Sequence, residues 1–454
     1  MRGLGFAMQQ EVRPLAGLAV PIVIGFAASM LISITDSIML APLGPVPLAA
    51  VGLTGAVSNI VFAGVWGLLT ALGVRIGTAW GAGEGRRIPH ILRNGLILGA
   101  MAGLAGSLAM GAIWVVLPLL GQPAEVIEAM PVYWTLIALF MLPYAILTVF
   151  KSAFEAVDRA WLGTGFAFLA VLINIPLNYW MIWGGAGVPP LGLTGAGVAS
   201  LVAEIIAMGA AWVYWLKAPS MRRLRLRRPV DWREVASAGR EGAPLGLLYT
   251  VEAMAMTAAT VMIGTFGTVA LAANQVIWSV AGVLYMVPLG IAGAVAIRVA
   301  QENGAGNMGA LRPITWTAQA LALVWLGLAA VIMGFGGRAI AGAITPDEAV
   351  VALAAQMFLV IALTQIFDGV QSIMLGSLRG MSDTAWPANV SVVAYWLIAL
   401  PAGWIIAHHM GLGAVGVWLG FALGTALAGL ALTLRFLSQT RGEAEAVRLG
   451  LQPV

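Results

Sequence analysis

The chain has 454 residues, of which 61% are hydrophobic and 9% are charged. So small a share of charged side chains cannot cover a soluble body of this size, and we expect lipid to replace water as the main solvent. The chain has no cysteine, which excludes disulfides, thiol catalysis and iron–sulfur ligation. Its net charge of +4 would suit a nucleic-acid partner, but the distribution of the basic residues argues against one.

Twelve apolar stretches follow one another along the chain, each long enough to cross about 30 Å of hydrocarbon as a helix. The residues before the first stretch carry no cleavage signal, so we expect that stretch to be retained. β-barrel alternation is absent, and nothing of domain size remains between the stretches. The sequence therefore predicts an all-α membrane protein with twelve transmembrane helices: 14–40, 48–80, 90–119, 125–154, 160–184, 192–217, 241–265, 273–302, 311–336, 347–378, 384–408 and 412–438.

The basic residues gather on one side of this predicted topology. Of the 23 lysines and arginines, only Arg338 falls in an odd-numbered loop, and the others lie at the termini, in even-numbered loops or at adjoining helix ends. By the positive-inside rule, both termini are expected to be cytoplasmic. The densest basic run, 221–229, joins the sixth and seventh helices and is expected to be a cytoplasmic anchor that ties the two halves together at the headgroups, the alternative being an RNA-binding or anionic-lipid site.

The sequence repeats itself at an offset of about 220 to 225 residues. Three segments match their counterparts: Val74-Arg75-Ile76 with Ile297-Arg298-Val299, Asp158 and Trp161 with Asp383 and Trp386, and Gly192-Leu193 with Gly411-Leu412. Because each half has an even number of helices, both halves enter the membrane in the same sense, as two parallel six-helix repeats around a central cavity. The predicted domains are an N-lobe (1–217), a basic cytoplasmic linker (218–240), a C-lobe (241–438) and a cytoplasmic tail (439–454).

The sequence contains no convincing motif for binding a nucleotide or a cofactor. Neither lysine of the chain fits a phosphate-binding loop, and Gly411 to Gly416 spells a dinucleotide-binding pattern in a short turn with no strand ahead of it. The three histidines lack metal-ligand spacing. An intramembrane enzyme stays an alternative, although no nucleophile–base pair is evident. We therefore expect a carrier without a cofactor, driven by an ion gradient.

Four acidic residues lie deep within the predicted apolar spans, away from their ends: Asp36, Glu204, Glu252 and Asp368. A charge at the centre of the bilayer costs about 2.5 kcal/mol or more unless it faces a cavity or a partner, and none of the four has a basic residue at helical spacing on its own span. We therefore expect each to be protonated, hydrated or bound to a cation. This predicts coupling to sodium or protons, the alternative being a protonated acid that is hydrogen-bonded to a neighbouring carbonyl.

The fifth predicted helix carries Asn174 and Asn178, two amides one turn apart and therefore on one face. Pro176 between them disturbs the backbone hydrogen bonds and can free a carbonyl. With Asp36, the amides would form an oxygen-rich site for a hard cation such as sodium, or a network that relays a proton. Their alternative role is to hold helices together.

Several segments resemble the NorM branch of the multidrug and toxic compound extrusion (MATE) family, in matching order and on the same numbered helices. They are Gly242-Ala-Pro-Leu-Gly246, Val251-Glu252, Ala272-Ala-Asn-Gln275, Val287-Pro-Leu-Gly-Ile291, Ile297-Arg298-Val299, Asp368, the turn Leu378 to Asp383, and Asn174 to Asn178. The resemblance implies a bacterial inner-membrane antiporter. It would be a monomer that exports cationic amphipathic drugs or dyes in exchange for sodium or protons.

The resemblance also implies roles for single residues. Asp36, Asn174 and Asn178 would form a cation or proton site in the N-lobe, and Glu252 and Asp368 one in the C-lobe. Each is a candidate sodium site. Some relatives carry a tyrosine one turn before the second acid, where this chain has Thr364. Glu204 corresponds to no family site. The main alternative is a lipid-linked precursor flippase of related architecture, whose cavity should be rich in cations rather than acids.

Overall fold

The computed structural model confirms the predicted fold class. Helices are the regular structure of the described residues, apart from an isolated bridge between Gly185 and Val188. Twelve of the helical segments are long and apolar enough to cross a membrane. The structure describes these residues: 2–120, 123–185, 187–219, 221 and 229–441.

The first half of the chain contributes six membrane-spanning helices. They are α1 (Arg2–Leu40), α2 (Pro45–Gly81), α3 (Ile88–Val116), α5 (Pro131–Ala156), α6 (Ala160–Trp183) and α7 (Leu193–Lys217). The fourth predicted span began too early, because Pro131 starts α5 and the residues before it form the separate short helix α4 (Ala124–Ala129). Proline suits the first position of a helix, where its missing N–H group has no partner to lose.

The second half contributes α8 (Trp232–Gly264), α9 (Thr268–Gly304), α10 (Leu311–Ile344), α11 (Glu348–Gly380) and α14 (Gly413–Gln439). Its fifth span is composite. Short α-helices α12 (Ala385–Val392) and α13 (Leu400–Trp404) alternate in it with π-helical turns at Val393–Ala399 and Ile405–His409. Pro401 lacks an N–H group and crowds the turn before it, which accounts for the wider winding around it.

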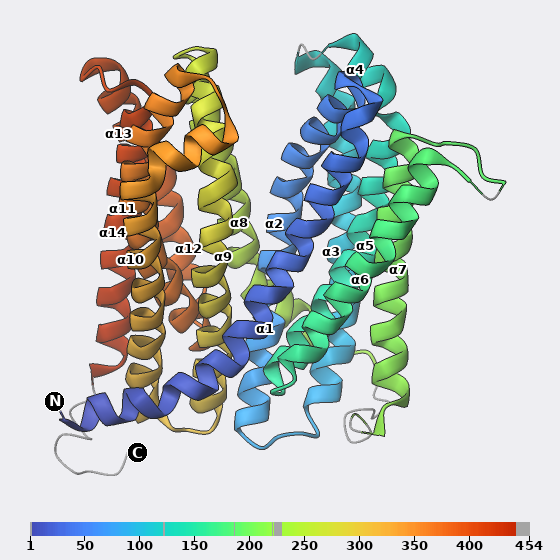
Figure 1. Ribbon diagram of the computed structural model, residues 1–454. Helices are drawn as coiled ribbons and strands as arrows, with labels where there is room; N and C mark the ends of the chain where they lie inside the picture. The colour runs from blue at the N-terminus through green and yellow to red at the C-terminus, as the bar shows by residue number, and fades with distance from the viewer. Residues whose placement is uncertain (1, 121–122, 186, 220, 222–228, 442–454) are drawn as a thin grey trace. The chain divides into compact units, whose positions relative to one another are not determined.

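The helices form two compact units, which we call the N-terminal unit (24–250) and the C-terminal unit (1–23 with 251–454). In the first, α5 packs against α2, α3, α6 and α7; in the second, α11 packs against α9, α10 and α14 (Figure 1). The two units divide α1 after residue 23 and α8 after residue 250, whereas the predicted lobes meet in the linker, and the predicted domain division stays a prediction. Part of the predicted linker and most of the predicted tail, including the basic run up to residue 228, lie outside the described residues.

Close packing in the C-terminal unit depends on small residues in α14. A Cβ atom at Gly416 would lie 2.6 Å from the backbone nitrogen of Ala407, and one at Gly420 would overlap the backbone of Gly403. Glycines one turn apart let the composite span approach α14 at backbone distance. This contact is the structural role of the glycine-rich turn that resembled a dinucleotide motif.

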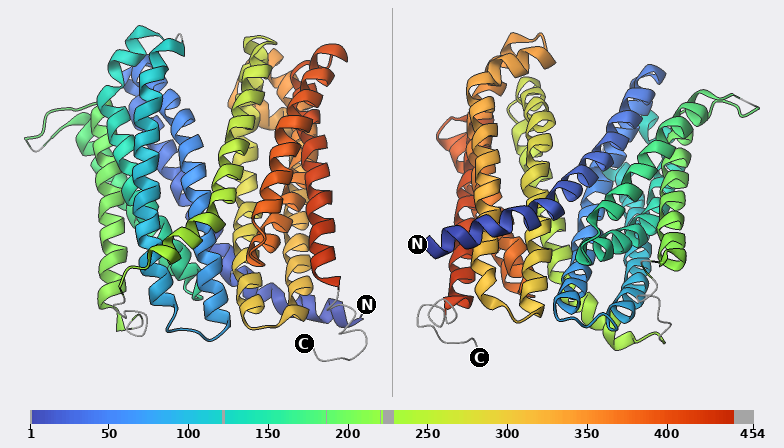
Figure 2. Two further views of the ribbon diagram at one scale, coloured as in Figure 1. Left: turned by 180° about the vertical axis from the view of Figure 1, so that it is seen from behind. Right: turned by 60° about the horizontal axis from the view of Figure 1, so that its bottom comes forward.

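The start of α1 belongs to the C-terminal unit and crosses its helices near their ends (Figure 2). Arg298 of α9 forms an ion pair with Glu11, with 3.1 Å between Nε and Oε2, and a second one with Glu302. The hydroxyl of Thr317 in α10 donates to the carbonyl of Met8 at 3.1 Å. We call the contact between Arg298 and Glu11 the α1 clasp.

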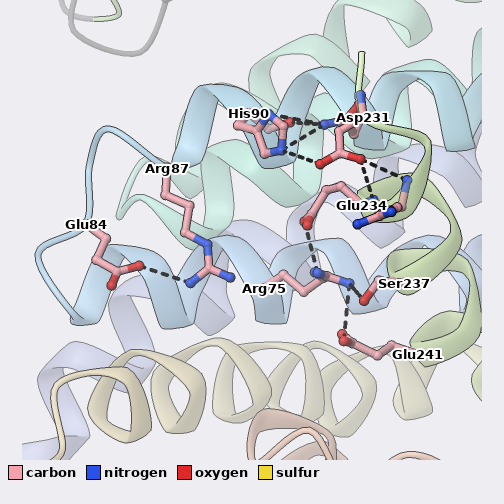
Figure 3. A network of polar contacts seen from close by, with 10 residues as sticks. Arg75, Glu84, Arg87, His90, Asp231, Glu234, Ser237 and Glu241 are labelled. Carbon is pink, nitrogen blue, oxygen red and sulfur yellow. Dashed lines mark hydrogen bonds and ion pairs between the residues drawn. The ribbon is translucent and has the colours of Figure 1, made fainter. Parts of the chain in front are cut away.

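The start of α8 is held in the N-terminal unit by a similar contact (Figure 3). Arg75 of α2 forms ion pairs with Glu234 at 2.9 Å and with Glu241 at 3.2 Å, and donates to the hydroxyl of Ser237. Asp231 accepts hydrogen bonds from the backbone N–H groups of Arg233 and Glu234, the second and third residues of α8, as a capping side chain does. We call the contact between Arg75 and Glu234 the α8 clasp.

The two clasps are equivalent positions of the sequence repeat. Arg75 and Arg298 are 223 residues apart (298 − 75), and so are Glu11 and Glu234 (234 − 11). The backbone repeats at the same offset: Gly44 and Gly267, which precede α2 and α9, have φ of 111° and 100°. Left-handed φ values of this kind favour glycine. The repeat read from the sequence is therefore also a repeat of backbone geometry.

Candidate functional site

The first candidate site lies where α1, α6 and α7 meet in the N-terminal unit. Asp36 stands one turn before the end of α1, and Asn174 and Asn178 stand one turn apart on α6. The Asn178 amide donates to Asp36 Oδ1 and, at 2.9 Å, to Asn174 Oδ1. The structure thus brings together the three residues that the sequence placed in one site.

A fourth side chain, Ser200 of α7, closes this group into a ring. The amide of Asn174 donates to Ser200 Oγ at 3.1 Å, and the Ser200 hydroxyl donates to Asp36 Oδ2 at 3.3 Å. Both amides are fully buried, and Asp36 is 8% exposed. Every hydrogen bond of the ring that reaches Asp36 comes from a neutral donor. The ring can therefore solvate a carboxylate in an apolar setting without supplying a counter-charge.

The second candidate site lies in the C-terminal unit and contains two acids. Glu252 of α8 and Asp368 of α11 interact electrostatically, and both are partly exposed. The hydroxyl of Tyr395 donates to Glu252 Oε1 at 3.3 Å. Asp368 interacts electrostatically with the hydroxyls of Tyr285 and Tyr395. Two carboxyl groups that repel each other are a strong site for a proton or another cation, because binding one relieves the repulsion.

A second layer of polar groups positions the two tyrosines. The amide of Gln371 donates to Tyr395 Oη at 3.3 Å and to Ser391 Oγ at 3.4 Å. The hydroxyls of Tyr285 and Ser372 are 2.5 Å apart. Tyr395 stands on the first π-helical turn of the composite span, and such turns frequently occur at functional sites. The wider winding re-aims this side chain towards the acids.

The two remaining sequence candidates lie apart from these groups. The Thr364 hydroxyl donates to the carbonyls of Val360 and Trp418, so it is occupied by the backbone and the structure does not join it to the acids. Glu204 stands on α7 one turn beyond Ser200 and interacts electrostatically with Lys151 of α5. Its basic neighbour thus comes from another helix, which spacing along α7 alone cannot show.

Comparison with known proteins decides which family these sites belong to. A family model described as MatE matches residues 21–180 and 244–405. The chain belongs to the MatE family. The two matched segments coincide with the two halves of the repeat, and they contain Asp36, Asn174, Asn178, Glu252 and Asp368.

Individual relatives agree with this assignment over nearly the whole chain. A Synechococcus protein described as a probable multidrug resistance protein NorM is 30% identical over 98% of each chain. A Bradyrhizobium diazoefficiens protein of the same description is 34% identical over 92% of this chain and 91% of its own. The crystal structure of the eukaryotic MATE transporter AtDTX14 superposes with a TM-score of 0.87 at 22% identity, covering 97% of this chain and 100% of that one.

Membership of the MatE family fixes the broad function. The chain is a multi-pass membrane protein of a family of multidrug efflux transporters, not an enzyme. The family assignment also sets aside the flippase alternative. Which ion and which compounds it carries does not follow from family membership.

Sequence reasoning missed Ser200, Tyr285, Tyr395 and Gln371, which complete the sites in this family member. Single hydroxyls and amides in apolar helices are common, and nothing along their own helices marks Ser200, Tyr285 or Tyr395. One signal was available for Gln371, which stands three residues after Asp368 and therefore on a neighbouring face of the same helix. The others are defined by contacts between helices, which spacing does not reveal.

Proposed function

We propose that the protein exports cationic, amphipathic small molecules by alternating access in exchange for entering protons. The observation that carries the proposal is the presence of one acidic site in each unit, each surrounded by neutral hydrogen-bond donors. A proton that binds a carboxylate there removes a negative charge that otherwise attracts a cationic compound. Proton and drug then compete for the same electrostatic field, which is what exchange requires.

The direction of transport follows from differential binding. An ion drives a conformational change only if it binds the two conformations with different affinity. Protonation of Asp36 removes the negative charge of the carboxylate that accepts hydrogen bonds from Asn178 and Ser200. The hydrogen bonds that hold α1, α6 and α7 in this arrangement become weaker, so another arrangement of the three helices is favoured. Protonation of Glu252 or Asp368 removes the repulsion between them. Either event favours the conformation that releases the drug outside.

Sodium is the second candidate, and one observation favours it. The Oδ1 atom of Asn178 is buried and accepts no hydrogen bond within the described part of the chain. A free amide oxygen beside the carboxylate of Asp36 is a ligand that a hard cation prefers. The proton is the better proposal because the ring presents N–H and O–H donors, not oxygen lone pairs, to Asp36.

We further propose that the protein acts as a monomer in the bacterial inner membrane, without a cofactor and with both termini in the cytoplasm. The loop between α7 and α8 and the ends of α2 and α9 then face the cytoplasm. Asp36, near the end of α1, lies towards the outside. This orientation rests on the distribution of arginine and lysine along the chain.

Efflux of a fluorescent organic cation from proteoliposomes tests the proposal, with a pH gradient and a sodium gradient imposed separately. We expect the pH gradient alone to accelerate efflux. Acceleration by sodium alone at constant pH would identify sodium as the coupling ion. Absence of any response from folded protein, shown by an unchanged thermal unfolding transition, would refute ion-driven export.

A further inference from the structure

Glu204 is a buried carboxyl group that the two sites described above do not use. It is 6% exposed in the middle of α7. Its carboxyl group makes no hydrogen bond to any other residue that the structure describes. A group of this kind costs about 2.5 kcal/mol or more in a membrane helix when charged, unless a partner or cavity compensates. The residue that compensates the charge of Glu204 therefore decides whether Glu204 can be ionised.

That partner is Lys151, which reaches into the N-terminal unit from α5. The ammonium group acts electrostatically on Glu204 and lies 4.8 Å from the centroid of the Phe26 ring. Two glycines leave room for the side chain. A Cβ atom at Gly25 would lie 3.2 Å from Lys151 Nζ, and one at Gly163 would lie 3.0 Å from its Cγ. A cation beside an aromatic face and a carboxylate is stabilised where water is scarce.

Helix α5 places this pair in line with the site around Asp36. Tyr133 interacts electrostatically with Asp36, and Tyr144 with Glu204. These tyrosines are three turns apart and Lys151 follows two turns later, so all three lie on one face of α5. The order along this face is Asp36, then Glu204, then Lys151.

Two other helices give the same order independently. On α7, Ser200 contacts Asp36, and Glu204 follows about 6 Å farther along the helix. On α1, Gly25 beside Lys151 stands three turns before Asp36, about 16 Å away along the helix and on the same face. In the proposed orientation, the Glu204–Lys151 pair therefore lies on the cytoplasmic side of the Asp36 ring.

We propose that Glu204, paired with Lys151, is a second proton-binding group of the N-terminal unit, through which a proton leaves Asp36 towards the cytoplasm. The proposal rests on the proton exchange proposed above. In the transfer, the O–H bond of Asp36 breaks and an O–H bond of Glu204 forms, so Asp36 returns to its carboxylate. Release of the proton from Glu204 restores a carboxylate that faces the ammonium group.

The groups that face Glu204 suit this role. From α5 it faces Tyr144 and Lys151. The only titratable side chain of α6 is Tyr179, which is 65% exposed. Lys151 is thus the one nearby cation among the residues described here. Because its positive charge favours the carboxylate form of Glu204, Glu204 can release the proton again.

Replacement of the carboxyl group tests the proposal in proteoliposomes loaded with a fluorescent cation. For Glu204→Gln we expect efflux driven by a pH gradient to fall by about tenfold or more, because the amide keeps the shape but cannot bind the proton. Exchange of labelled for unlabelled cation without a gradient should persist, because it needs reorientation but no proton.

Lys151→Met gives a second readout that a purely structural pair would not change. Without the ammonium group the neutral acid is favoured up to higher pH, so the pH midpoint of efflux should move upwards. An unchanged midpoint would overturn the proposal, even if Glu204→Gln failed to fold. Wild-type efflux in Glu204→Gln would also overturn it, and so would recovery of driven efflux in the variant that combines Glu204→Gln with Lys151→Met.

The wild-type protein separates this proposal from the proposed function. If wild-type efflux responds to the pH gradient and Glu204→Gln responds equally, the Glu204 relay is wrong and proton exchange stands. If the wild-type protein responds to sodium alone or to neither gradient, proton exchange is wrong, and the relay that rests on it is wrong as well.

Discussion

Replacement of Asp36 separates its role in transport from its role in packing. Asp36→Ala leaves the Asn178 amide and the Ser200 hydroxyl without their acceptor. A buried donor that loses its partner costs about 1–3 kcal/mol, so the two together should lower the free energy of unfolding by about 2–6 kcal/mol. Asp36→Asn keeps one oxygen acceptor for Ser200. It also gains an amide that can donate to the free Oδ1 of Asn178, so it should lose no more than about 1 kcal/mol.

The two variants should therefore differ in stability but not in transport. We expect both to lose efflux driven by a pH gradient, because neither can bind a proton at residue 36. Denaturant unfolding in detergent measures the first difference, and cation efflux from proteoliposomes measures the second. Normal driven efflux in Asp36→Asn would refute the coupling role of this acid. Equal stability of the two variants would refute the hydrogen-bonded ring.

Three further predictions concern the C-terminal unit. Tyr395→Phe removes the hydroxyl that donates to Glu252, so we expect slower driven efflux, a changed pH profile of efflux and a stability change within about 1.5 kcal/mol; an unchanged pH profile would contradict this. Arg298→Gln should lower the free energy of unfolding by about 1.5–3 kcal/mol, because it breaks the α1 clasp. Adding Glu11→Gln should restore part of this loss. If denaturant unfolding shows that nothing is restored, the contact is not an ion pair. Gly420→Ala should lower the free energy of unfolding by about 1–3 kcal/mol, because it forces α14 away from the composite span. Gly327→Ala is the control, because its Cβ atom meets no neighbour and should not destabilise the fold. Equal unfolding midpoints of the two variants would contradict this packing.

The fold was largely predictable because its main determinant is local. Each span is an apolar run, and lipid forces such a run to satisfy its own backbone hydrogen bonds as a helix. The places where prediction went wrong are the polar ends of helices. Residues 2–13 and 232–240 carry charged side chains and read as loops, yet they are helical and hold Glu11 and Glu234. Both acids were visible in the repeat, at the same offset as Arg75 and Arg298.

The candidate site was predictable only where the signal lies in one side chain. An acid in an apolar span is costly and therefore conspicuous, which identified Asp36, Glu252 and Asp368. The amide pair on α6 was found from its one-turn spacing. Ser200 and Tyr395 act through contacts between helices, and hydroxyls are cheap to bury when they donate to a carbonyl. Lys151 was assigned to a helix end, and only the packing of α5 against α7 shows that it interacts electrostatically with Glu204.

The exchange of helix starts between the two units constrains how such a chain can evolve from a single half. Consider a six-helix ancestor with an arginine at the end of its second helix and a glutamate near the start of its first helix. Such a chain could form these ion pairs only with another copy, in which the start of each first helix packs against the other copy. Gene duplication and fusion would convert these two contacts between copies into the α1 and α8 clasps. Two fragments made by cutting between α7 and α8 should accordingly hold each other, because each still carries the piece that completes its neighbour.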